Sequence, residues 1–127
     1  MTTATQTTVL LVDDDAHFRE TLADAMSLKD VRVESAGSVA DARRALAQRL
    51  PSVILLDVQL PDLSGIELCR QLKRDPRTKG VPVVLLSAKY TEPADRAEGL
   101  LTGADAYLSK PINIEALQEE IRYLVDN

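Results

Sequence analysis

The stretch Val53-Ile54-Leu55-Leu56-Asp57 decides the fold that we predict for this chain. Four aliphatic residues precede one carboxylate, and the turn-forming segment Pro61-Asp62-Leu63-Ser64-Gly65 follows soon after. A short apolar run bounded by turn residues is typical of a strand that is buried on both faces of a parallel sheet. In open parallel sheets, ligands bind in the crevice outside the carboxyl ends of the strands. Asp57 is therefore either a turn residue or the reactive group of a site.

Length and composition point to one domain. The chain has 127 residues, which suits a single hydrophobic core, and we expect one domain over residues 1–127 with residues 1–7 as a disordered tail. This start has neither the charged nor the long apolar region of a signal peptide, and no run approaches the ~18 apolar residues of a membrane span. The net charge of −5 and the lack of a Lys/Arg run argue against a nucleic-acid surface. Cys69 is the single cysteine, which excludes a disulfide framework and favours the reducing cytoplasm.

Further short runs rich in aliphatic residues predict a parallel sheet. Four more strands are expected, at Val9–Val12, Val31–Ala36, Val81–Leu86 and Ala106–Ser109. Helical periodicity alternates with the strands, so five helices are expected, at about 16–28, 38–50, 64–75, 91–103 and 113–124. Alternating strands and helices with short loops predict an α/β fold whose helices cover both faces of the sheet through right-handed crossovers.

Individual residues indicate how these helices begin and which faces they bury. Two capping boxes are predicted, Ser38 with Asp41 and Ser64 with Glu67, and Pro51 stops the second helix. The buried positions expected in the first two helices are Phe18, Leu22, Ala25 and Met26 in the first, and Val39, Ala42, Leu46 and Leu50 in the second.

Polar residues collect where the predicted strands end. Asp13 and Asp14 follow the first strand, Asp57 ends the third, Ser87 ends the fourth, and Lys110 ends the fifth. Each residue alone has an ordinary explanation, because aspartate is common at caps, serine is common in turns and a lone lysine is usually solvated. In a parallel sheet, however, all these ends lie on the same edge. The shared edge therefore favours a functional site.

The charges at this edge predict phosphoryl chemistry. Carboxylates a few ångströms apart raise one another's pKa or recruit a cation, and an oxygen-rich cluster suits Mg²⁺. Lys110 adds a positive charge and Ser87 adds a hydroxyl donor. Together these groups would bind a tetrahedral, multiply charged phosphoryl group. Asp57 can then act as a nucleophile and form an aspartyl phosphate.

Four motifs in combination make the chain resemble the receiver domain of two-component response regulators, from about Val9 to Leu124. They are Asp13-Asp14, Asp57-x-x-x-Pro61-x-x-x-Gly65, Ser87-Ala88 and Lys110-Pro111. The resemblance implies a flavodoxin-like fold, a doubly wound five-stranded parallel sheet in the order 2-1-3-4-5 with five helices. It also implies that Asp57 accepts a phosphoryl group from a sensor histidine kinase or a phosphotransfer protein.

The resemblance also implies a role for each residue of the site. Mg²⁺ would be held directly by Asp14, Asp57 and the backbone carbonyl of Gln59, whereas Asp13 would act through water. Lys110 would contact the phosphoryl oxygens.

A switch is implied as well. Ser87 would move toward the phosphoryl group and Tyr107 would turn inward after it, so that a partner reads the face formed by the fourth helix, the fifth strand and the fifth helix. An ordinary aromatic on a half-exposed edge strand is the alternative for Tyr107.

Three residues outside the motifs have ordinary interpretations. Asp15 is expected to cap the first helix, His17 to lie on the surface of that helix, and Cys69 to lie in the core.

Two other function classes stay open. The first is a phosphatase or phosphotransferase that uses Asp57 as its nucleophile, but haloacid-dehalogenase-like phosphatases have Asp-x-Asp and residue 59 is Gln. The sequence has no Gly-x-x-x-x-Gly-Lys loop, which argues against a nucleotide hydrolase. The second is a phosphate-independent interaction module. The chain can equally be a stand-alone receiver or part of a hybrid kinase or larger regulator.

Overall fold

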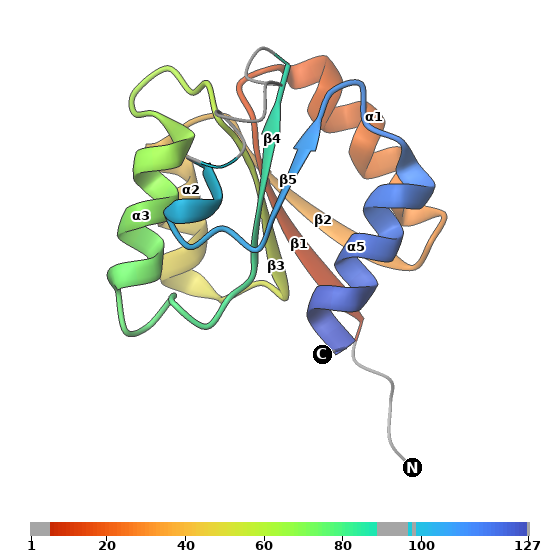
Figure 1. Cartoon of the computed structure of the whole chain (residues 1–127). Helices are drawn as coiled ribbons and strands as arrows, with labels where there is room; N and C mark the ends of the chain where they lie inside the picture. Colours follow the sequence, from red (N-terminus) through yellow and green to blue (C-terminus); the bar gives the residue numbers. More distant parts are fainter. Residues whose placement is uncertain (1–5, 89–96, 98, 127) are drawn as a thin grey trace.

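The computed structural model describes residues 6–88, 97 and 99–126 of the chain. Five strands form one parallel sheet in the order β2-β1-β3-β4-β5, which confirms the predicted topology (Figure 1). The strands are β1 (Thr7–Val12), β2 (Val31–Ala36), β3 (Val53–Asp57), β4 (Val83–Ser87) and β5 (Ala106–Ser109).

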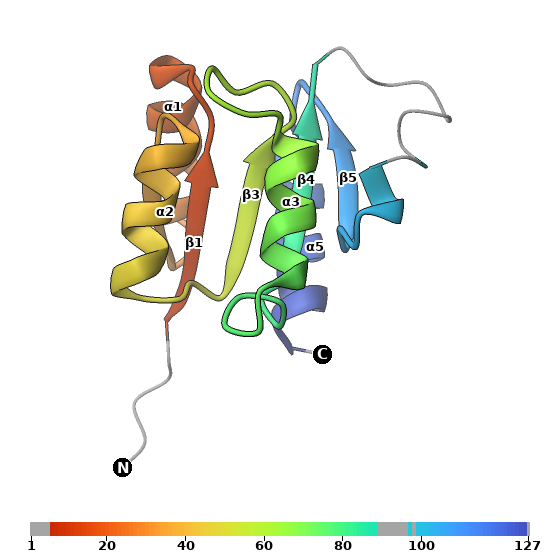
Figure 2. The ribbon, with the colours of Figure 1, turned by 90° about the vertical axis from the view of Figure 1, so that its left-hand side faces the viewer.

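The helices form a layer on each face of the sheet. They are α1 (Ala16–Ser27), α2 (Val39–Gln48), α3 (Gly65–Arg74) and α5 (Ile114–Asp126). α2 and α3 cover one face, and α1 and α5 cover the other (Figures 1 and 2). Residues 99–101 belong to the helix expected between β4 and β5, while its predicted start at Thr91 lies outside the described residues. Gly103, with φ of +98°, follows that helix as predicted.

Strand β3 shows why the sheet is buried on both sides. Ile54 and Leu56 pack with α2 and α3, whereas Val53 and Leu55 pack with α1 and α5. Successive side chains of a strand point to opposite faces, so every residue of β3 meets a helix layer. Burying each such aliphatic side chain contributes about 1.5–3 kcal/mol. The only polar residue of β3, Asp57, stands at the carboxyl end.

Two strands begin elsewhere than predicted. β1 starts at Thr7, which pairs with Val31, so the predicted disordered tail of residues 1–7 is wrong at that residue, while residues 1–5 lie outside the described residues. β4 starts at Val83 rather than Val81, because Pro82 has no N–H to donate and the Val81 N–H donates to Thr78 in a turn.

The prediction that Leu50 belongs to the buried stripe of α2 is wrong. The helix ends at Gln48, and Arg49 is extended with φ of −161° and ψ of 140°. Leu50 is 37% exposed. A residue before proline disfavours the helical region, so Pro51 acts on the chain ahead of it and the helix ends two residues earlier than its apolar spacing suggests.

Serine caps begin α2 and α3, but only half of each predicted capping box forms. The Ser38 Oγ accepts from the Asp41 N–H, and the Ser64 Oγ accepts from the Ile66 N–H. The acid three positions after each serine pairs within its own helix instead, as Asp41 does with Arg44.

None of the helices in the described ranges is both long and apolar enough to cross a membrane.

Candidate functional site

The structure brings the predicted site residues together at the carboxyl edge of the sheet. The Lys110 Nζ lies 2.6 Å from Asp13 Oδ2 and 3.9 Å from Asp57 Oδ2. Lys110 follows β5, Asp13 follows β1 and Asp57 ends β3. The carboxyl ends of these parallel strands lie at the upper edge of the sheet in Figure 1. The lysine is thus closer to Asp13 than to the candidate nucleophile.

A carboxylate cluster at this edge fits a hard cation. One oxygen from each of Asp13, Asp14 and Asp57 lies within 4.8 Å of the others. Asp13 is 0% exposed, and its two oxygens accept from Lys110 Nζ and from the Asp15 N–H. Asp14 is exposed, so its oxygens are open to a ligand. Three carboxylates within this range match the oxygen-rich donor set of Mg²⁺, with Asp13 the most engaged of them.

Burial makes Asp57 reluctant to ionise. Its side chain is almost fully enclosed, with 7% of the residue exposed. This burial, together with the negative charge of Asp13, raises the pKa of Asp57 from 3.8 to about 6. Lys110 and the Gln59 N–H, which donates to Asp57 Oδ1 at 3.3 Å, act in the opposite direction. With a pKa of about 6, Asp57 is ionised at neutral pH, but burial and the negative charge of Asp13 make this ionisation costly.

Strand pairing places Ser87 next to Lys110. Ser87 is buried at the end of β4 and pairs with Ser109 of β5. The Lys110 N–H donates to the Ser87 carbonyl at 2.8 Å, and the Lys110-Pro111 peptide bond is cis. Ser87 and Lys110 thus lie at the ends of neighbouring strands, at the same level of the edge.

Tyr107 lies inside the protein. It is 3% exposed and belongs to the core layer beneath α2 and α3, so the ordinary aromatic role that was the alternative would be a core role rather than a half-exposed one. A Cβ built on Gly99 would lie 2.8 Å from the Tyr107 ring and 3.0 Å from Leu85. The missing side chain at Gly99 therefore makes the space in which the ring sits.

We expect Gly99→Ala to displace the Tyr107 ring and to lower the free energy of unfolding by about 1–3 kcal/mol. Near-ultraviolet circular dichroism and urea unfolding measure the two effects. Combining Gly99→Ala with Tyr107→Leu should recover part of the loss, because the smaller side chain vacates the space. Equal losses in the single and double variants would contradict this packing.

The residues with ordinary predicted roles lie where we expected them. Asp15 caps α1, because its Oδ1 accepts from the Phe18 N–H at 3.1 Å. His17 is exposed. Cys69 is buried, and burial raises the pKa of its thiol.

Two further residues of α1 reach the site. The Arg19 Nη1 donates to the Asp13 carbonyl at 2.7 Å. The Phe18 ring centroid lies 4.2 Å from Lys110 Nζ, although the apolar spacing suggested only a core position for Phe18. The signal in the sequence was the short distance from Asp14, because a helix that begins directly after β1 keeps its first turn beside the carboxyl edge.

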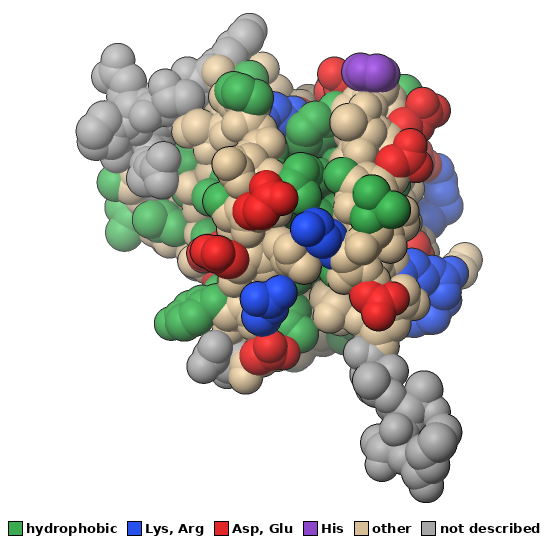
Figure 3. Space-filling model, turned by 90° about the vertical axis from the view of Figure 1, so that its right-hand side faces the viewer, with side chains coloured by type: hydrophobic (Ala, Val, Ile, Leu, Met, Phe, Trp, Pro, Cys, Tyr) green, Lys and Arg blue, Asp and Glu red, His purple; other side chains and the backbone are tan. Residues whose placement is uncertain are grey.

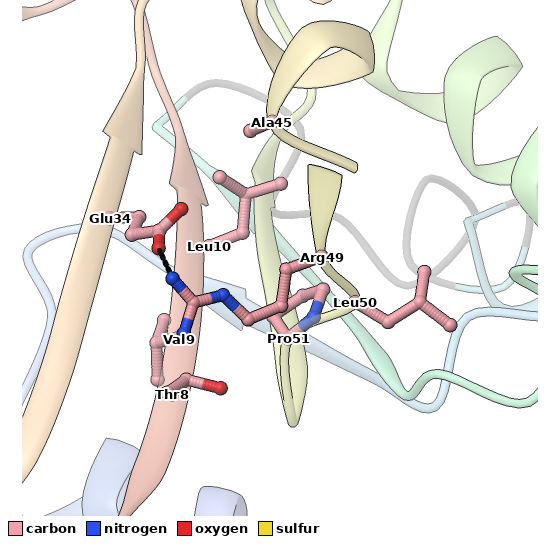
Figure 4. Close-up of a pocket in the computed structure, with 8 residues that line it drawn as sticks. All are labelled: Thr8, Val9, Leu10, Glu34, Ala45, Arg49, Leu50 and Pro51. Carbon is pink, nitrogen blue, oxygen red and sulfur yellow. Dashed lines mark ion pairs between the residues drawn. The ribbon is translucent and has the colours of Figure 1, made fainter. Parts of the chain in front are cut away.

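The cavity drawn in Figure 4 lies away from this edge. Its lining includes Thr8 and Leu10 of β1, and the Arg49–Glu34 ion pair at 3.9 Å crosses it. Its volume of about 10 Å³ would admit about one water molecule. This cavity is therefore too small for a substrate.

Figure 3 shows acidic, basic and apolar side chains interspersed over the face of α1 and α5. Among the described residues on that face, Lys and Arg form no continuous patch.

A family model, the response regulator receiver domain, matches residues 9–122. The chain belongs to this family. The phosphate regulon transcriptional regulatory protein PhoB of Pseudomonas aeruginosa is 39% identical to this receiver domain over 115 residues, 91% of this chain and 50% of PhoB. Histidine kinase P4 of Formosa agariphila is 34% identical over 122 residues, 96% of this chain and 9% of the kinase. This receiver domain spans about half the length of PhoB and of other curated relatives such as the transcriptional regulatory protein GltR.

Solved structures agree with the receiver fold. The chemotaxis response regulator CheY4 of Vibrio cholerae superposes with a TM-score of 0.86 at 28% identity, covering 94% of this chain and 99% of CheY4. The predicted fold class and membership of the two-component systems are therefore confirmed.

Proposed function

We propose that this receiver domain accepts a phosphoryl group on Asp57. The observation that carries the proposal is the Lys110 ammonium, held 2.6 Å from the buried Asp13 and 3.9 Å from Asp57. A cation so near the carboxylate can meet the oxygens of an arriving phosphoryl group. In this proposal Asp57 is the nucleophile, and Lys110 and Ser87 bind the phosphoryl oxygens. The residues that would hold Mg²⁺ are Asp14, Asp57, the Gln59 carbonyl and, through water, Asp13.

The transfer needs one bond to form and one to break. An Asp57 carboxylate oxygen attacks the phosphorus and forms the new bond. The bond from phosphorus to the donor's leaving atom breaks, and its electron pair leaves with that atom. The Lys110 ammonium shares its charge between Asp13 and the phosphoryl oxygens, and the Ser87 hydroxyl turns to donate to one of them. When bound, Mg²⁺ supplies positive charge that offsets the negative charge of the phosphoryl oxygens.

The product is a signal rather than a turnover. Ser87 and Tyr107 relay the charge at the edge to the face formed by the helix before Gly103, β5 and α5. The register supports this relay, because Ser87 pairs with Ser109, two residues beyond Tyr107. The close approach of Gly99 to the Tyr107 ring supports a coupling of Tyr107 to that helix, because a movement of the ring changes the space beside Gly99.

The donor in this proposal is a sensor histidine kinase or a phosphotransfer protein, and the setting is the cytoplasm. One relative is named as a transcriptional regulatory protein and another as a histidine kinase. These names support a place for this receiver domain in a pathway that includes a histidine kinase. The proposed phosphoacceptor unit is a single domain over residues 1–127.

Intact mass spectrometry after treatment with acetyl phosphate and Mg²⁺ tests the proposal. We expect one phosphate adduct on the wild-type protein and on Asp24→Asn, an exposed aspartate of α1, but none on Asp57→Asn. An adduct that persists in Asp57→Asn would refute the assignment. Continuous release of phosphate from phosphate esters well above a blank would favour a phosphatase instead.

A further inference from the structure

The ammonium of Lys110 lies over the aromatic ring of Phe18. The Nζ is 4.2 Å from the ring centroid, within the range of about 6 Å in which a ring face attracts a cation. Only 19% of the Lys110 side chain is exposed, and the Phe18 side chain is half-buried. Partial removal from water strengthens such an attraction. The ring is therefore a third partner of the lysine beside Asp13 and Asp57.

Hydrogen bonds at the start of α1 connect Phe18 to the acidic cluster. The Asp15 N–H donates to Asp13 Oδ1 at 2.9 Å, and the Phe18 N–H donates to Asp15 Oδ1 at 3.1 Å. The Lys110 Nζ returns to Asp13 Oδ2 at 2.6 Å. The cap of α1 thus fixes the position of Phe18 relative to Asp13, and Lys110 spans the two.

The lysine has to serve two carboxylates at different distances. Its 2.6 Å hydrogen bond to Asp13 is directional, while the 3.9 Å separation from Asp57 is too long for one. A flexible four-carbon stem lets the ammonium move, and a ring face attracts a cation over a range of positions. Phe18 can therefore keep hold of the ammonium while it shifts from Asp13 toward Asp57.

We propose that Phe18 is a positioning residue for phosphoryl transfer, whose ring holds the Lys110 ammonium between Asp13 and Asp57. This inference rests on the proposed phosphorylation of Asp57. The simpler role for Phe18 is packing, because its side chain also contacts the core layer beneath α1 and α5. Packing alone requires only an apolar side chain of similar size, whereas holding a cation requires an aromatic face.

The rate of adduct formation with acetyl phosphate and Mg²⁺ separates the two roles. Acetyl phosphate is small, so docking of a protein partner cannot account for an effect. We expect Phe18→Leu, and Phe18→Met as a second aliphatic variant, to slow the reaction about three- to tenfold. Phe18→Tyr, which keeps the ring face, should recover most of the rate.

Leu22→Val is the matched control. Leu22 is buried in the same helix and the same core layer, but its aliphatic side chain has no ring face to offer Lys110. We expect it to lower the urea midpoint while the rate stays within about twofold of wild type. Wild-type rates in both aliphatic variants of Phe18, or a loss in Phe18→Tyr as large as theirs, would overturn the inference.

A spectroscopic readout does not depend on activity. The chain has no tryptophan, so Phe18→Trp places a single indole beneath the ammonium. We expect Lys110→Met in that background to shift the fluorescence emission, and an unchanged spectrum would overturn the contact. Absence of any adduct on the wild-type protein would defeat the proposed function and this inference together. A normal wild-type adduct with unaffected aliphatic variants would defeat the inference alone.

Discussion

Replacing Gly65 by alanine should lower the free energy of unfolding by about 2–4 kcal/mol. A Cβ at this position would lie 2.0 Å from the backbone oxygen of Asp57 and 2.9 Å from the Cα of Val58. Both are backbone atoms of the site strand and its loop, so neither can rotate away as a side chain could. The Gly65 N–H also donates to the Val58 carbonyl at 2.8 Å, which binds the start of α3 to that loop.

The same substitution should disturb the chemistry, because relief of the clash has to move the Asp57 peptide. Urea unfolding followed by circular dichroism measures the stability, and adduct formation with acetyl phosphate measures the site. Gly80→Ala is the control, because a Cβ there meets nothing within 4 Å, and its stability should stay within about 1 kcal/mol of wild type. Equal urea midpoints for the two alanine variants would refute the expected crowding at Gly65.

Removing the charge of Asp57 should stabilise the metal-free protein at neutral pH, by up to about 3 kcal/mol. Burial and Asp13 raise the pKa of Asp57 from 3.8 to about 6. Between these values the folded state binds more protons than the unfolded state, so stability falls as pH rises through that window. Asp57→Asn removes the group that titrates and should keep the stability that the wild-type protein loses.

Urea midpoints in the presence of a chelator, at about pH 4 and about pH 7, test this sign. The difference between Asp57→Asn and the wild-type protein should grow toward the higher pH. Added Mg²⁺ should reduce it, because a cation at the cluster stabilises the ionised form of Asp57 against burial and the negative charge of Asp13. Asp24→Asn, an exposed change on α1, should follow the wild-type profile. If the stability difference between Asp57→Asn and the wild-type protein shrinks as pH rises, the raised pKa of Asp57 is contradicted.

Some boundaries were predictable and others were not, for identifiable reasons. The bounds of β2, β3 and β5 agree with the prediction, because apolar or alternating runs bounded by turn residues define a buried strand without knowledge of its neighbours. Leu50 was misplaced because its apolar character fits the helical period while Pro51 ends the helix earlier. The burial of Tyr107 was not predictable, because β5 is an edge strand and only the tertiary structure brings the helix residue Gly99 close enough to cover its ring.

The sequence by itself determined that polar groups gather at one edge of the sheet. Strands buried on both faces leave no room for charge except at their ends, and parallel crossovers place those ends together. Only the tertiary structure decided which charges pair there. Asp13 rather than Asp57 is the near partner of Lys110, which lies 97 residues further along the chain, and Phe18 faces the same ammonium. Such pairings depend on rotamers and on distances between remote segments, which the periodicity of the sequence does not specify.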